Sequence, residues 1–246
     1  MTGSNCCAND RMHWYELNSN LQITSRKDIQ INIDRQRFAL IPKAETRPFV
    51  MDWNRDGIQD LVVALRVFDR QKSATPMNQF QPKLFVKLGS KGKNLAAPIA
   101  AGPQQAAGTL HAAGTTIQLE PFEFNNGSEE RWRKLLGQGW QVFVEFAFGD
   151  VDADGNVDLI FSEMLRRLAL DQNTNRWFVA DIKSGVYWMK NEAASAMPEF
   201  AEIRSLYQAE PKQAIIAIAA ADVDQDGKLD VAIQSAGKLQ LLSQSK

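Results

Sequence analysis

The sequence predicts an all-β chain made of antiparallel strands, and three observations predict it. A short acidic motif occurs three times in the 246 residues. Apolar segments rich in β-branched residues flank every copy, and another apolar segment follows each flanked pair. No apolar run approaches the roughly 20 residues of a membrane helix, so we expect no membrane span.

The acidic motif reads D-x-[DN]-x-D-G-x-x-D. We number its positions 1 to 9 and call its copies loop one (residues 52–60), loop two (150–158) and loop three (222–230). Together they hold eleven of the 29 acidic residues, so the other 18 acids stand against 28 lysines and arginines. The small net charge therefore hides a segregation of negative charge into three loops.

The spacing of the motif is typical of a calcium cage. Carboxylates this close repel one another unless a cation lies among them. Calcium takes about six to eight oxygens, and positions 1, 3 and 5 of one tight loop converge on it. The glycine at position 6 permits a positive-φ turn, position 7 offers its backbone carbonyl, and position 9 closes the cage. Loop one carries Asn54 instead of an aspartate, so we expect it to bind calcium least well.

The motif is not that of an EF-hand. An EF-hand has a glutamate at position 12 and a helix on each side. Position 12 is Val63, Phe161 or Ile233 here, and the segments on both sides are short, apolar and strand-like. Each acidic loop is therefore predicted to join two strands.

Two further strands are predicted downstream of each loop. The copies of a third strand are "MHWYELN" (12–18), "KLFVKLG" (83–89), "GVYWMKN" (185–191) and "GKLQLLS" (237–243). A fourth strand is predicted at "AAPIAA" (96–101) and "AMPEFAEI" (196–203). Four-stranded antiparallel units with a fixed loop between the first and second strands are the pattern of a β-propeller or of part of one.

The segments "RPFVMDWNRDGIQDLVVA" and "FGDVDADGNVDLIFSE" resemble the FG-GAP or VCBS-type repeats of calcium-binding β-propellers, which also occur in integrin α-chain heads. The resemblance implies up to three Ca²⁺ ions. Its implied ligands in loop one are Asp52, Asn54, Asp56, the backbone of Ile58, and Asp60. Those in loop two are Asp150, Asp152, Asp154, the backbone of Asn156, and Asp158. Those in loop three are Asp222, Asp224, Asp226, the backbone of Lys228, and Asp230.

The predicted domain organisation is a disordered tail over residues 1–10, which carries Cys6 and Cys7, and one propeller-like domain over 11–246. The units amount to about three and a half blades, interrupted by an insertion at 103–138. Propellers typically have about four to eight blades. A longer parent propeller, a second copy of the chain, a fourth blade within 103–138, or ring closure by the N-terminal strands would each complete the ring.

The segments between units differ most in length. Ser128 is a plausible N-cap for one short helix within residues 125–139. The connection from second to third strand is a tight hairpin at 235–238 but is long at 66–82 and 165–183. Insertions concentrated on one face favour ligand binding there, although neutral loop drift explains them equally well.

Signals for catalysis are sparse. His13 and His111 are the only histidines, and neither lies in a nucleophile or zinc motif. Asp150 with Glu163 or Glu145 is the best candidate carboxylate pair for sugar chemistry. We therefore expect a non-enzymatic protein, with a carbohydrate-active enzyme or its accessory domain as the alternative.

The expected role is an adhesion or ligand-recognition module that binds a protein or a carbohydrate. Trp132 and Trp177 lie in insertions, where an exposed indole would stack on a sugar ring. The basic stretches 131–134 and 166–167 are too small for a nucleic-acid interface. The resemblance and the plentiful calcium outside cells favour an extracellular, cell-surface or periplasmic location, although no export signal is visible.

Overall fold

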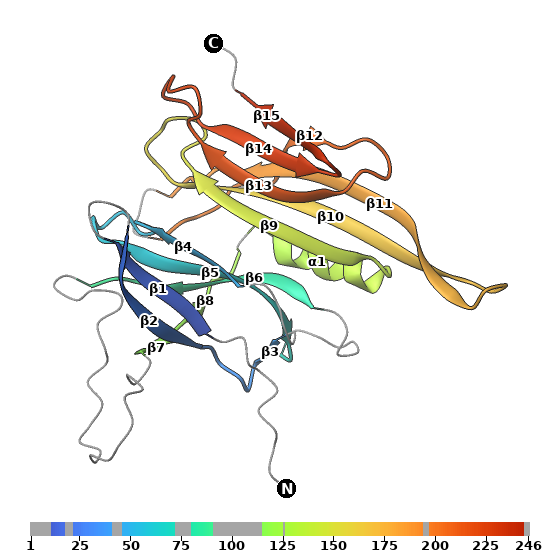
Figure 1. The fold of residues 1–246 in the computed structure, drawn as a ribbon, viewed down its shortest axis with the longest axis horizontal. Helices are drawn as coiled ribbons and strands as arrows, with labels where there is room; N and C mark the ends of the chain where they lie inside the picture. The colour runs from blue at the N-terminus through green and yellow to red at the C-terminus, as the bar shows by residue number, and fades with distance from the viewer. Residues whose placement is uncertain are drawn as a thin grey trace, which may run out of the picture. The chain divides into compact units, whose positions relative to one another are not determined.

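The computed structural model describes residues 11–17, 22–40, 46–71, 80–90, 115–124, 126–193 and 197–243. These residues form fifteen strands and one helix, so the prediction of a mostly β, largely antiparallel chain is confirmed (Figure 1). They divide into two compact units, one up to residue 74 together with 83–122, the other 75–82 together with 123–246. The predicted tail with its two cysteines lies outside the described residues.

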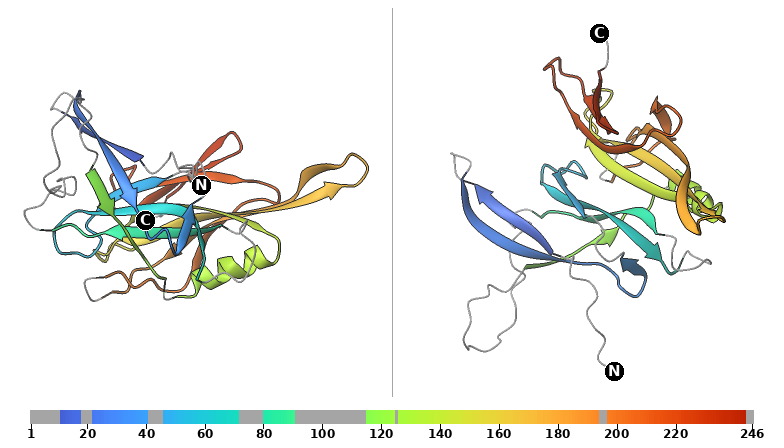
Figure 2. Two further views of the ribbon diagram at one scale, coloured as in Figure 1. Left: turned by 90° about the horizontal axis from the view of Figure 1, so that it is seen from below. Right: turned by 45° about the vertical axis from the view of Figure 1, so that its right-hand side comes forward.

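Unit one holds two sheets that share one core. Its elements are β1 (Arg11–Leu17), β2 (Ile23–Asn32), β3 (Phe38–Leu40), β4 (Arg47–Met51), β5 (Asp60–Asp69), β6 (Gln81–Lys87), β7 (Thr115–Gln118) and β8 (Glu120–Pro121). One sheet has the order β1-β2-β7; in the other, β3 and β4 both pair with β5, followed by β6 and β8. Ile31 of β2, Val63 of β5 and Ile117 of β7 meet in this core, around which the strands curl (Figure 2).

Unit two is built from two packed sheets. Its strands are β9 (Gln141–Gly149), β10 (Asp158–Asp171), β11 (Arg176–Met189), β12 (Arg204–Gln208), β13 (Ile215–Ala221), β14 (Asp230–Ser235) and β15 (Lys238–Leu242). The sheets have the orders β12-β11-β10-β9 and β13-β14-β15. Ile160 and Val186 of the first sheet share a core with Ile218 and Ile233 of the second. Burial of these apolar faces holds the two sheets together.

Helix α1 (Ser128–Gly137) covers the other face of the first sheet of unit two. Its Trp132 is fully buried, with ring contacts to Phe146 and Phe161. The helix lies within the residues predicted, but its N-cap is Gly127 rather than Ser128. Gly127 adopts the left-handed conformation, and the Asn126 side chain accepts the N–H of Ser128 (3.1 Å), so the cap bond comes from outside the helix.

The strands on either side of each acidic loop are confirmed: β4 and β5, β9 and β10, and β13 and β14 are antiparallel neighbours. The third strands β6, β11 and β15 lie next to the second strands. A fourth strand lies next to the third in both units, β8 beside β6 and β12 beside β11, but the prediction of 196–203 for the one in unit two is wrong. Phe200 forms a single bridge with Asn191, and β12 begins at Arg204. The other predicted fourth strand, 96–101, lies outside the described residues.

Candidate metal centres

The three acidic loops have the same backbone geometry. Position 4 is a non-glycine residue with positive φ in each: Arg55 (61°), Ala153 (58°) and Gln225 (60°). Position 6 is Gly57 (81°), Gly155 (84°) and Gly227 (85°). Few side chains tolerate this region, so two left-handed residues within three positions define a specific turn.

The aspartate at position 1 organises each turn by accepting two backbone N–H groups. In loop two Asp150 accepts the N–H groups of Asp154 (3.0 Å) and Gly155 (2.8 Å). The same two bonds measure 3.1 and 2.9 Å in loop one and 3.1 and 3.0 Å in loop three. A carboxylate has about four acceptor sites, so the position-1 side chain keeps capacity for a cation.

The aspartate at position 5 accepts the N–H of position 7 in each loop, at 2.8, 2.8 and 2.9 Å. This bond fixes the backbone of Ile58, Asn156 and Lys228, the three residues predicted to offer carbonyls. Their role as carbonyl ligands stays a prediction.

The aspartate at position 9 is buried and ties its loop to the sheet. Asp158 accepts the N–H of Val151 (3.0 Å) at position 2 and that of Asn191 (2.7 Å) just after β11. In loop one Asp60 does the same with Trp53 (2.8 Å) and Gly89 (2.6 Å). These bonds to the third strand were not predicted from the sequence, because nothing in the motif points to residues about 30 positions away.

Asp230 of loop three accepts the N–H of Val223 (3.0 Å) at position 2. The register of β14 and β15 pairs Val231 with Leu242, so the position corresponding to Asn191 is residue 244, which lies outside the described residues. Burial raises the pKa of Asp158, although the N–H groups of Asn191 and Val151 oppose this shift. The position-9 aspartates therefore stabilise the loops with or without a metal.

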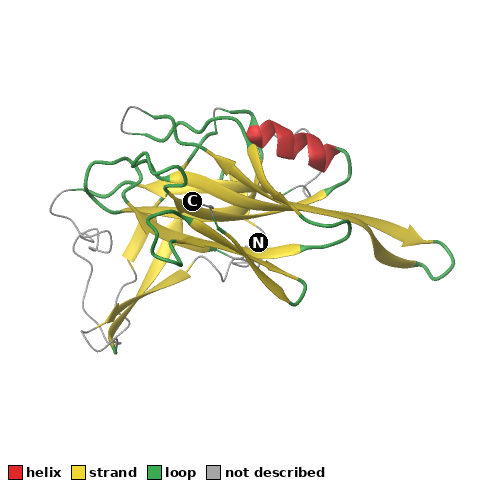
Figure 3. Cartoon of the chain, turned by 90° about the horizontal axis from the view of Figure 1, so that it is seen from above, coloured by secondary structure: helices red, strands yellow, loops and turns green. Residues whose placement is uncertain are grey.

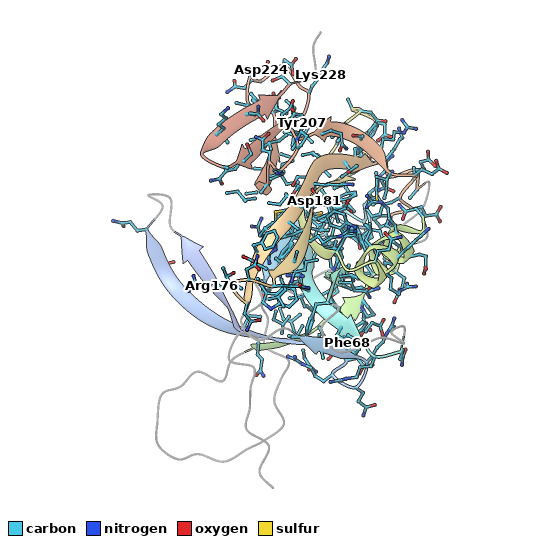
Figure 4. The ribbon with its side chains drawn as sticks, turned by 90° about the vertical axis from the view of Figure 1, so that its right-hand side faces the viewer. Phe68, Arg176, Asp181, Tyr207, Asp224 and Lys228 are labelled. Atoms are coloured by element: carbon cyan, nitrogen blue, oxygen red, sulfur yellow. The ribbon has the colours of Figure 1, made fainter. Side chains whose placement is uncertain are left out.

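The structure brings together different carboxylates in loops two and three. In loop two, oxygens of Asp150, Asp152 and Asp158 lie within 4.8 Å of one another. In loop three the group is Asp222, Asp224 and Asp226; Figure 4 labels Asp224 and Lys228 of this loop. Each group has three of the four predicted carboxylates, so neither loop assembles the full set.

Lys190 lies beside the carboxylates of loop two. Its ammonium group forms ion pairs with Asp152 and with Asp154 (2.8 Å) of loop two. The hydrogen bonds to these carboxylates raise the pKa of Lys190, and the bond from Lys190 lowers the pKa of Asp154. Loop two thus already has a cation of the protein's own beside its carboxylates, which the sequence analysis missed.

Loop one differs from both. The Asn54 amide donates to Asp56 (3.1 Å), and Asn54 Oδ1 accepts the Asp56 N–H (3.3 Å). In the described part of the chain, no group of three carboxylates forms in this loop. Asn54 replaces the repulsion between two carboxylates with a hydrogen bond, so loop one needs a cation less than the other two loops.

The residues considered for sugar chemistry differ in their burial and in their hydrogen bonds. Glu163 is buried and binds Arg131 through two hydrogen bonds, one of 2.7 Å, and the Trp132 indole N–H (3.0 Å). Trp132 is therefore a core residue. Trp177, in contrast, is 68% exposed.

No protein-family model, no curated protein and no solved structure matches this chain. Over the part of the chain that the structure describes, no helix combines the length and the apolar character that crossing a bilayer requires.

Proposed function

We propose that the three acidic loops bind Ca²⁺ and that the chain is a calcium-stabilised β-propeller, or part of one, that serves as a binding or scaffold module. Loops two and three are the stronger sites because each gathers three carboxylates. The single observation that carries the proposal is the common loop geometry, in which position 1 orients the turn and position 9 anchors it.

The chemistry of these oxygens fits calcium. Calcium prefers hard oxygen ligands in flexible arrangements, and the side chains at positions 1, 3, 5 and 9 offer carboxylate oxygens and, at Asn54, an amide oxygen. The proposed ligands are the fifteen residues at positions 1, 3, 5, 7 and 9 that the resemblance implies. A bound ion would remove the repulsion within each cluster, so its binding free energy would add to the stability of the fold.

The proposed partner is a protein or a carbohydrate at the cell surface, outside the cell or in the periplasm. The long β10–β11 hairpin supports a binding role because it presents apolar side chains to solvent. The exposed indole of Trp177 is the observation that favours the second candidate, a carbohydrate-active enzyme or its accessory domain. Glu163 is a poor acid or base for that chemistry because Arg131 and Trp132 occupy its oxygens.

The test is thermal unfolding of the full chain in millimolar calcium and in excess EGTA, with magnesium held constant. At calcium a hundred times above the dissociation constant, one site adds about 2.7 kcal/mol. For a chain of this size we therefore expect the melting temperature to rise by roughly 5 to 10 °C per strong site.

The matched variants are Asp222→Asn with Asp226→Asn, which should abolish the contribution of loop three, and Glu210→Gln, which changes an exposed acid outside the loops. Equal calcium shifts in the loop variant and in Glu210→Gln would show that loop three does not bind the ion. The absence of any shift in the wild-type chain would refute the calcium proposal as a whole.

A further inference from the structure

The hairpin of β10 and β11 extends beyond its sheet. The register of β9 with β10 ends at Arg166, and that of β12 with β11 ends at Gly185. Beyond these points the two strands pair only with each other, up to Asp171 and Arg176. We call residues 167–181 the arm; it projects from the rest of unit two in Figure 3.

The outer edge of β10 in the arm is open. No described strand pairs with it from residue 167 to 171, and no backbone hydrogen bond from a described loop reaches it. The outer edge of β11, in contrast, is partly occupied next to the arm, because the backbone N–H of Lys212 donates to the carbonyl of Ile182 (3.3 Å). An open edge offers a row of N–H and C=O groups to another strand.

One face of the arm carries four apolar side chains, and the other carries Ala169 and the half-exposed Phe178. The register pairs Leu168 with Val179 and Leu170 with Trp177, which places these four side chains on one face. Leu170, Val179 and Trp177 are 41%, 45% and 68% exposed. The turn that follows Asp171, in contrast, is polar ("QNTN"). A polar tip with apolar flanks suits contact along the side of the arm rather than insertion of its tip into a lipid surface.

The open edge reads Arg167-Leu168-Ala169-Leu170-Asp171. If a second copy of this strand lies antiparallel with the two-fold axis at Ala169, Leu168 faces Leu170 of the other copy and Arg167 faces Asp171. Residues directly opposite each other lie on the same face of the sheet. The residue numbers in each pair are both even or both odd, so leucine lies opposite leucine and arginine lies opposite aspartate. The edge is therefore complementary to itself.

Across the hairpin, Arg167 lies opposite Asp181 and Asp171 lies opposite Arg176, but neither pair forms an ion pair in the described residues. In the described residues no carboxylate lies within ion-pair distance of Arg167, whose guanidinium lies over the Trp140 ring at 4.3 Å. Asp171 accepts only uncharged donors, Thr174 Oγ1 (2.8 Å) and the N–H of Asn173 (2.9 Å). Both remain available to a partner strand.

We propose that the chain forms a two-fold dimer in which the β10 edges of two arms pair antiparallel about Ala169 and make a four-stranded sheet. The interface is isologous, so each contact occurs twice. The β11 edge is unsuited to this arrangement because the register shift opposite Arg167 and Leu168 leaves Ala180 as an extra residue that interrupts the alternation.

The first test is cross-linking in a background in which Cys6 and Cys7 are changed to serine. Ala169→Cys places two thiols opposite each other at the two-fold axis, within the range that a disulfide bridges. We expect a covalent dimer under mild oxidation and little dimer for the control Ala180→Cys on the neighbouring strand. Equal cross-linking of the two variants, or none for Ala169→Cys, would overturn the proposal.

The second test is sedimentation equilibrium of charge-reversal variants of the full chain. Arg167→Asp or Asp171→Arg alone places like charges opposite each other twice, and each should weaken dimerisation by at least about tenfold. The double variant restores opposite charges across the axis and should recover the dimer. A monomeric wild-type chain at high concentration, or single variants that dimerise as well as the wild type, would show that another partner or none covers the edge.

Discussion

Loops two and three have the same turn, yet they are embedded differently in unit two. At position 2, Val151 of loop two belongs to the core, whereas Val223 of loop three is 57% exposed. Asp158 of loop two holds backbone N–H groups on both sides, and Asn191 continues this network to the N–H groups of Ala193 and Glu199 (both 3.1 Å).

The two loops also differ in charge. Lys190 pairs with two carboxylates of loop two, while the register of β14 with β15 places Ser243 at the position in loop three that corresponds to Lys190. The same local motif is therefore stabilised in two different ways. Loop two draws its stability from the surrounding protein, and loop three has more to gain from a bound ion.

The largest expected difference concerns the buried aspartate at position 9. Asp158→Ala leaves two buried N–H groups without an acceptor, each at a cost of about 1 to 3 kcal/mol, so the free energy of unfolding should fall by about 2 to 6 kcal/mol. Asp230→Ala should cost about 1 to 3 kcal/mol, since one such bond is seen. Urea unfolding in EGTA measures both. Equal losses would contradict the different embedding of the two loops.

The next effect concerns the shared turn. Gly155→Ala and Gly227→Ala force alanine into a left-handed conformation, which should lower the free energy of unfolding by about 1 to 2 kcal/mol each. The added Cβ atom causes no clash because nothing lies within 4 Å of it. Gly137→Ala, at a helical glycine with equally open space, is the control and should not destabilise the chain. Unequal costs for the two loop variants would mean that their backbones differ in solution.

A third prediction separates the two loops by charge and rests on the proposed calcium sites. Lys190→Met removes the competing ammonium group but keeps the apolar stem, so calcium affinity of loop two should rise roughly tenfold. Lys238→Met matches the change in net charge on an exposed lysine of β15 and should leave the affinity unchanged. Titration calorimetry distinguishes them. If both variants gain affinity equally, net charge and not the Lys190 ion pairs controls binding.

The smallest effect concerns position 4. Ala153→Gly and Gln225→Gly remove the strain of a left-handed non-glycine residue, but the extra freedom of the unfolded chain offsets most of the gain. We therefore expect the free energy of unfolding to rise by up to about 0.5 kcal/mol in each loop. Ala219→Gly, in the extended strand β13, should instead lose about 0.5 to 1 kcal/mol. Thermal unfolding of the three variants side by side is the measurement. A loss at Ala153 comparable to that at Ala219 would argue against the left-handed turn.

The sequence by itself determined the acidic turns and the strands that flank them. Positions 1, 5, 6 and 9 lie within nine residues, so the bonds from Asp150 to the N–H groups of Asp154 and Gly155 are local and follow from spacing. The short apolar segments, rich in β-branched residues, likewise predicted β9, β10, β13 and β14, because segment length and residue type are local properties.

Tertiary structure decided what surrounds the turns. The bond from Asn191 to Asp158, the ion pairs of Lys190 and the burial of Glu163 against α1 join residues 31 to 38 positions apart. They depend on the register between strands and on how the helix packs, and neither is encoded in a nine-residue window. The same register opens the β10 edge of the arm, since β9 ends its pairing at Arg166 while β10 continues to Asp171.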